Sequence, residues 1–189
     1  MGTVVGMRTR TLRAALGIAM LVALTGCVDG DPLPTLPPTP TSTPVFASEE
    51  EALAAAEAAY EAYNEMSNTI AAEGGRDPER IEPFVTPNYL PSEVDTYDYY
   101  RVNGLHLEGG VRVARLSLQQ YLELDGSAEV AVYVCLDVLA ARVIDNSGVD
   151  VTPRDRDDVI PLEVVFVGVS RDELKIDRSD QWSDSSFCS

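Results

Sequence analysis

Two side chains of this chain could act as an acid–base pair, His106 and Asp137. His106 is the only histidine among 189 residues. Asp137 ends a run of alternating apolar residues and shares one face of a predicted strand with Tyr133 and Cys135. A general base needs a pKa near the working pH and a place in a pocket, and the sequence shows neither. Each residue therefore has a non-catalytic alternative. His106 could be packed or exposed near a turn, and Asp137 could lie on the solvent face of a sheet.

Aromatic side chains are the other candidates for a binding site. They are Tyr60 and Tyr63 in a predicted helix, Tyr97 and Tyr100 in a second aromatic-rich segment, and Trp182 near the C-terminus. At helical spacing we favour the core for Tyr60 and Tyr63 over the wall of a pocket. For residues 97–100 we expect one face to enter the core and leave the other free to rim a cavity.

The sequence contains no recognised motif for a cofactor or a metal. It has no Gly-rich phosphate loop and no G-x-S-x-G nucleophile elbow. Asp155, Asp157 and Asp158 cluster in a predicted loop, as do Asp145 and Asp150 around a turn. Neither group has the alternating ligands and terminal glutamate of a calcium loop, and the cysteines and the single histidine lack zinc spacing. We therefore predict no metal and no cofactor.

A long helix must position Tyr60 and Tyr63. Ser48 and Glu51 have the spacing of a capping box, and Gly74-Gly75 ends the helix. The apolar stripe consists of Leu53, Ala56, Tyr60, Tyr63, Ser67 and Ile70. Short helices are predicted from Pro78 to Val85 and from Ser92 to Arg101, with breaks at Pro87 and Pro91.

From residue 106 the apolar pattern alternates, which predicts antiparallel strands. Its parity changes at Ala114-Arg115, where we expect a β-bulge, and Asp125-Gly126 is a hairpin signal. A long strand follows at 130–138, then a turn at 145–148, a central strand at 162–169 and a return strand at 174–177.

The N-terminus has the organisation of an export signal. Three arginines between residues 8 and 13 precede an apolar run of eleven residues, 14–24. The run is shorter than the roughly 20 residues of a bilayer span and fits a secretory signal. It ends in Leu-Thr-Gly-Cys at residues 24–27, which resembles the lipobox of bacterial lipoproteins. The resemblance implies that residues 1–26 are removed and that Cys27 carries lipid at the extracytoplasmic face of the cell membrane.

The mature chain would be strongly acidic. Removing residues 1–26 takes away three of 14 basic residues and no acid, which leaves 11 basic against 31 acidic residues and a net charge of −20. Such a surface repels phosphate backbones and anionic headgroups. We therefore exclude nucleic acid and expect membrane attachment only through the lipid on Cys27. Arginine outnumbers lysine thirteen to one, which favours a high-GC bacterium, and we predict an actinobacterium.

With Cys27 lipidated, Cys135 and Cys188 remain as one pair in an oxidising compartment, where a disulfide is the default. Two separate thiols are the alternative. Residues 28–47 are rich in proline and threonine, which predicts an extended tether after the lipidated cysteine. The folded part is then a single domain over residues 48–189.

The order of elements is a long helix, short helices and then four to five antiparallel strands, an α+β pattern. Together with the strand Tyr133–Asp137, the turn Asp145–Gly148 and the terminal Trp182 and Cys188, it resembles the nuclear-transport-factor-2-like (NTF2-like) cone superfamily. A cystatin-like sheet packed on one helix is the alternative. Some enzymes of the cone superfamily place an aspartate, or a His–Asp pair, in a cavity, which is the role that His106 and Asp137 would have.

These observations favour a lipid-anchored extracytoplasmic lipoprotein whose domain binds a small ligand or an envelope protein without catalysis. Two alternatives stay open. One is a small cone-type enzyme, an isomerase or dehydratase, that uses Asp137 and His106. The other is an accessory structural lipoprotein that anchors another exported protein.

Overall fold

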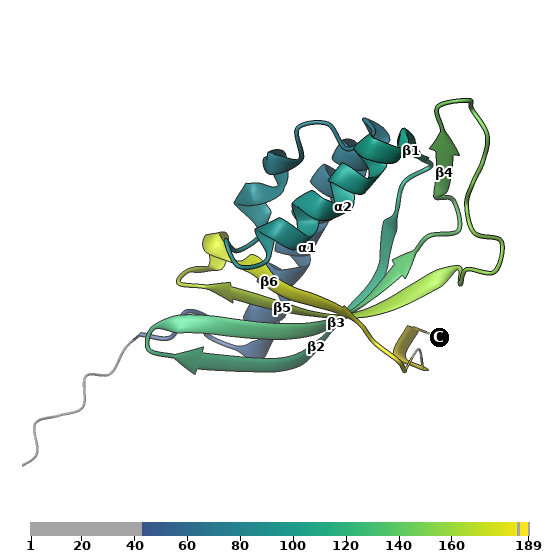
Figure 1. Cartoon of the computed structure of the whole chain (residues 1–189). Helices are drawn as coiled ribbons and strands as arrows, with labels where there is room; N and C mark the ends of the chain where they lie inside the picture. The colour runs from purple at the N-terminus through teal and green to yellow at the C-terminus, as the bar shows by residue number, and fades with distance from the viewer. Residues whose placement is uncertain (1–42, 185, 189) are drawn as a thin grey trace, which may run out of the picture. The chain divides into compact units, whose positions relative to one another are not determined.

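The computed structural model describes residues 43–184 and 186–188 (Figure 1). The predicted signal sequence, Cys27 and most of the tether lie outside the described residues. All described residues belong to one compact unit, Pro40–Ser189. Within it, no helix has the length and apolar character to cross a membrane.

The chain enters the fold before the first helix begins. Phe46, which the sequence pattern assigns to the tether, is buried and packs edge-on against Tyr121, with ring centroids 5.7 Å apart. The side chain of Glu123 accepts a hydrogen bond from the Val45 amide at 2.5 Å. Residues 45 and 46 are therefore anchored to the sheet.

The predicted long helix is confirmed as α1, Glu49–Ala72. Ser48 Oγ accepts from the Glu51 amide at 3.3 Å, and the Glu51 carboxylate accepts from the Ala47 amide at 2.7 Å. At the other end the amides of Gly74 and Gly75 bond back to the last turn of the helix, as in a Schellman cap. Both glycines have positive φ, which explains why glycine ends the helix there.

Two shorter helices follow α1. A 3-10 helix, η1, spans Pro78–Phe84, close to the prediction. The second is α2, Leu90–Asn103. It starts before Pro91, where a break is predicted from the sequence. Proline is tolerated in the first turn of a helix because the amide it lacks would have no partner there.

In the described part of the chain, six antiparallel strands form two sheets. The larger sheet has the order β2-β3-β5-β6, with β2 Arg112–Leu124, β3 Ser127–Asp137, β5 Val159–Gly168 and β6 Lys175–Gln181. The smaller sheet pairs β1, Leu105–Glu108, with β4, Arg142–Asp145. A separate two-stranded sheet is not predicted by the sequence pattern.

The pairing of β2 with β3 confirms the predicted register change. It shifts between Val113 and Arg115, where the bulge is expected, and again between Leu118 and Gln120. The hairpin turn at Asp125-Gly126 is also present, with φ of 53° and 79° at these two residues. Positive φ at both positions is the mark of a type I′ turn.

Helices α1 and α2 lie on the same side of the four-stranded sheet (Figure 1). Between them and the sheet lies a continuous core whose largest fully buried side chains include Phe166, Ile70 and Ile176. The α+β class and the curved antiparallel sheet packed by helices are therefore as predicted.

Candidate functional site

A buried carboxyl group lies between the two helices. Glu93, in the first turn of α2, is only 7 % exposed. Its Oε2 accepts a hydrogen bond from the Tyr63 hydroxyl of α1 at 2.8 Å and one from Tyr97, one turn further along α2, at 3.4 Å. A glutamate is rarely buried without a charged partner, so this cluster is the most unusual polar feature of the interior.

Burial sets the acidity of this cluster. Burial raises the pKa of Glu93, and the hydroxyls of Tyr63, Tyr89 and Tyr97 offset part of the rise. Burial likewise raises the pKa of each of these tyrosines. The cluster can hold a proton, and its polar atoms satisfy one another.

The aromatic candidates do not line a common cavity. Tyr60 and Tyr97 are each 3 % exposed and belong to the core, where Tyr60 packs edge-on against Phe166 at 6.4 Å between centroids. Tyr63 packs on Tyr60 and Glu93. Tyr100 is half-buried on α2. The space between α1 and the sheet is thus filled by side chains.

His106 and Asp137 lie in different sheets. His106 is on β1, opposite Ile144 of β4, and its Nε2 lies 3.8 Å from Glu108 Oε1. Asp137 ends β3 and binds the Arg112 guanidinium at 2.5 Å. The Leu139 amide and that guanidinium hold the pKa of Asp137 below its usual value. The structure therefore does not bring the two residues together, and a low pKa makes Asp137 a weak base.

The disulfide predicted from the cysteine count is present, between Cys135 and Cys188 with Cα atoms 5.6 Å apart. It holds the C-terminal segment against the sheet face opposite the helices. Trp182 and Phe187 stack on Tyr133 with centroids 5.1 and 5.0 Å away, and Arg115 donates to the Phe187 carbonyl at 2.7 Å. Trp182 therefore packs on the outer face of the sheet, far from the tyrosines of the core.

Among the described residues, His106 lines a hollow of about 410 Å³ together with Arg101 and Asn146, and three further hollows open on the surface. One, about 520 Å³, lies along the alanine-rich face of α1 beside Phe84 and Leu174. Another, about 660 Å³, lies beside the disulfide, between Asp157, Asp158 and Trp182. The third runs between α1 and the edge of β2 as two adjoining parts of about 440 and 240 Å³ that share Glu61 and Val113. Among the described residues no group of three acids, cysteines or histidines is arranged to hold a metal ion.

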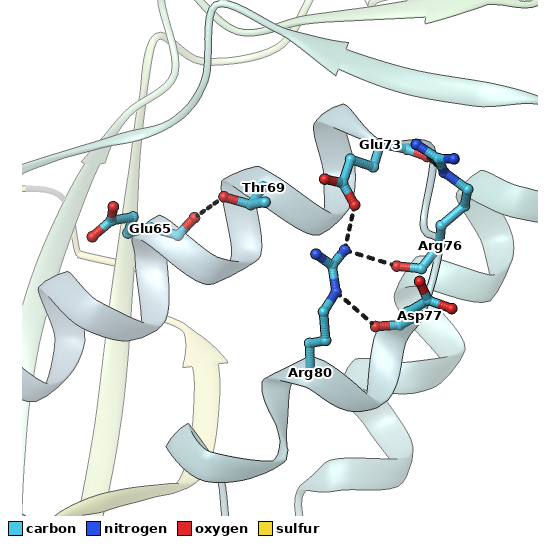
Figure 2. A network of polar contacts seen from close by, with 6 residues as sticks. All are labelled: Glu65, Thr69, Glu73, Arg76, Asp77 and Arg80. Carbon is cyan, nitrogen blue, oxygen red and sulfur yellow. Dashed lines mark hydrogen bonds and ion pairs between the residues drawn. The ribbon is translucent and has the colours of Figure 1, made fainter.

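The far end of α1 is tied to η1 by one arginine. Arg80 binds the Glu73 carboxylate at 2.5 Å and the carbonyls of Arg76 and Asp77 at 3.0 and 3.2 Å (Figure 2). Further back along α1, the Thr69 hydroxyl donates to the Glu65 carbonyl oxygen at 2.9 Å (Figure 2).

No protein-family model and no curated protein matches the chain. Solved structures do match the chain. The intermembrane-space region of the chloroplast protein ARC6 superposes with a TM-score of 0.52 at 15% identity, over 70% of this chain and 97% of that one. The fold is the predicted α+β arrangement, and this match is consistent with an NTF2-like cone.

Two further structures are similar at lower scores. One is a Catenulispora acidiphila protein in complex with S-DNPA, with a TM-score of 0.42 and 13% identity over 68% of this chain and 92% of that one. The other is the putative transfer protein TraH of the Gram-positive conjugative plasmid pIP501. Its TM-score is 0.37 and its identity 12%, over 75% of this chain and 98% of that one. At 15% identity, the likeness to the ARC6 region extends to the fold alone.

Glu93 is the functional candidate that the sequence analysis does not identify. The available signal is its spacing of four from Tyr97, which puts both on one face of a helix. Nothing local indicates that this face is buried, because Asp95, Thr96 and Asp98 beside it are polar.

Proposed function

We propose that this protein is a lipid-anchored extracytoplasmic lipoprotein whose NTF2-like domain binds partners through its outer surface, without catalysis. The observation that carries the proposal is the filled interior. In this fold a ligand would be expected between the helices and the sheet, and here Tyr60, Phe166 and Glu93 with its tyrosines occupy that space. The surface hollows are then the places where a partner could contact the domain.

Three sequence features support the anchoring. The apolar run that ends in Cys27 fits a lipoprotein signal, and the proline-rich segment after it suits a spacer between lipid and domain. The Cys135–Cys188 disulfide fits an exported protein. The excess of arginine over lysine supports an actinobacterial origin.

The anchor is tested by changing Cys27→Ser in a bacterium that processes lipoproteins. We expect the wild type in the membrane fraction at the mass of a processed, acylated chain, and the variant either released or retained as the unprocessed precursor. The double variant Cys135→Ser/Cys188→Ser is the control, since it removes two cysteines but leaves residue 27 intact. A Cys27→Ser chain of normal size in the membrane fraction would overturn the proposal.

A further inference from the structure

β2 is an edge strand with a groove alongside it. In the sheet order β2-β3-β5-β6, β2 pairs with β3 on one side, and no strand among the described residues pairs with its other side. The groove beside this free edge, called the α1–β2 groove below, is lined by α1 residues between 57 and 69, by Val111, and by residues 112–116 of β2. An unpaired edge offers backbone amides and carbonyls to an incoming chain.

One end of the groove shows how this edge is satisfied from within the chain. Asn68 accepts from the Val111 amide at 2.8 Å and donates to the Val111 carbonyl at 2.8 Å, and Asn64 donates to the same carbonyl at 3.0 Å. The two bonds of Asn68 reproduce those that a neighbouring strand would make. From Val113 to Leu116 the structure records no side chain that does the same for the backbone.

The helical wall of the groove is acidic. Glu57, Glu61 and Glu65 are exposed and follow one another every four residues. None of the three has an ion-pair partner within the described residues, and α1 contains no lysine or arginine. Like charges at this spacing oppose each other. Arg112 and Arg115 of β2 also line the groove, but each has another partner: Arg112 pairs with Asp137, and Arg115 donates to the Phe187 carbonyl.

The spacing of these glutamates matches an extended peptide. Glu57 lies near residues 113–116 and Glu65 near 111–113, so α1 and β2 run in opposite directions along the groove. Four helical residues advance about 6 Å, and alternate side chains of a strand repeat at about 6.6 Å. A strand laid along β2 would therefore pass Glu57, Glu61 and Glu65 with every second residue.

From the free edge, the unpaired glutamates and the matching repeat, we infer that the α1–β2 groove binds an extended segment of a partner protein that carries lysine or arginine at alternate positions. The segment adds to β2 as a further antiparallel or parallel strand, and its basic side chains pair with the three glutamates. This inference rests on the proposed function as an interaction domain and specifies the chemistry of its partner.

The probe is an octapeptide of alternating lysine and valine, capped at both ends and labelled with a fluorophore. Its binding to the purified full chain is measured by fluorescence anisotropy at about 150 mM salt, where the Debye length of about 8 Å screens non-specific attraction. We expect saturable binding at one peptide per chain. The triple variant Glu57→Gln/Glu61→Gln/Glu65→Gln should weaken it at least tenfold, while melting no lower than the wild type.

Two controls separate groove binding from simple charge attraction. The variant Glu49→Gln/Glu79→Gln/Glu82→Gln loses the same charge at exposed sites outside the groove and should bind as the wild type does. N-methylation of the peptide blocks strand pairing without altering its charge. Because only one set of amides faces β2, one of the two methylated peptides (all lysines or all valines methylated) should lose binding and the other should keep it.

Three results would each overturn the inference: no saturable binding, equal loss in the two glutamine variants, or binding that survives both methylations. None of these depends on Cys27. Failure of the peptide experiment therefore does not affect the proposed lipid anchor, and failure of the Cys27→Ser experiment does not affect the proposed groove.

Discussion

Glu93 shows what a single residue contributes to this interior. Its carboxyl group is enclosed by the hydroxyls of Tyr63 and Tyr97 and so links α2 to α1 by a polar contact. The two hydroxyls donate to the carboxyl group and partly favour its ionised form, but burial makes a charge in the core unfavourable and raises the pKa of Glu93. Glu93 therefore specifies how the helices pack, at a cost to stability that depends on pH.

We predict that Glu93→Gln is more stable than the wild type at pH 8 and equal to it at pH 4. Burial raises the pKa of Glu93 in the folded chain. Its favourable contribution is then complete below the pKa of the unfolded chain and is lost as the pH rises through the folded-state pKa. Glutamine keeps a hydrogen-bond acceptor and cannot ionise.

The measurement is the melting temperature of both proteins across this pH range. Glu79→Gln, at an exposed position, is the control and should follow the wild type throughout. A difference between Glu93→Gln and the wild type that does not change with pH would contradict the account of a buried, ionising carboxyl.

Sequence reasoning at the residue scale succeeds where a residue type implies its own chemistry. The pairing of Cys135 with Cys188 follows from counting cysteines in a chain that is predicted to be exported, and the structure confirms the disulfide. The burial of Glu93 depends on the docking of α2 against α1, which no local pattern contains. The separation of His106 from Asp137 likewise depends on β1 leaving the main sheet to pair with β4.

At the scale of elements, the turns and caps were the most predictable features. The limits of α1, the hairpin at Asp125-Gly126 and the bulge at Ala114-Arg115 all depend on residues within a few positions of the feature. The second register shift in β2 has no such local signal. The start of α2 before Pro91 has no local signal either, because it depends on where the preceding turn places the chain.

The junction between α1 and α2 gives a second prediction. Gly75 has φ of 75°, and a Cβ there would lie 2.0 Å from the Tyr97 carbonyl oxygen. Left-handed strain and the clash together should make Gly75→Ala cost about 3 kcal/mol. Gly126 is the matched control, because its φ is 79° and nothing lies within 4 Å of the same position.

Gly126→Ala should therefore cost only the backbone strain, about 1 kcal/mol. Urea denaturation of both variants measures the free energies of unfolding. Equal losses at the two glycines would show that the close approach of α1 to α2 at Tyr97 has no energetic weight.

The C-terminal segment provides a third prediction. The disulfide closes a loop with a sequence separation of 53, which should stabilise the domain by roughly 4 kcal/mol through the entropy of the unfolded chain. Reduction should then lower the melting temperature by roughly 10 °C. The variant Cys135→Ala/Cys188→Ala should melt at the lower temperature with or without reductant. A wild type that melts unchanged after reduction would show that the tail is held by Trp182 and Phe187 alone.

For the whole molecule, the interior and the surface differ in what they can do. The core is closed by apolar packing and by the Glu93 cluster, whereas the outer surface carries the hollows, the free edge of β2 and most of the acidic residues. We propose that a small domain built this way meets other molecules at its exterior. In the proposed function, a lipid on Cys27 and the tether after it would fix where those encounters occur.

The lipid anchor is therefore the central claim, and the mass of the mature N-terminal peptide tests it most directly. The protein is isolated from a bacterium that processes lipoproteins, digested, and analysed by mass spectrometry. We predict a first peptide that begins at Cys27 and carries the added mass of acyl chains. A first peptide that begins upstream of residue 27, or one that begins at Cys27 without added mass, would contradict the account.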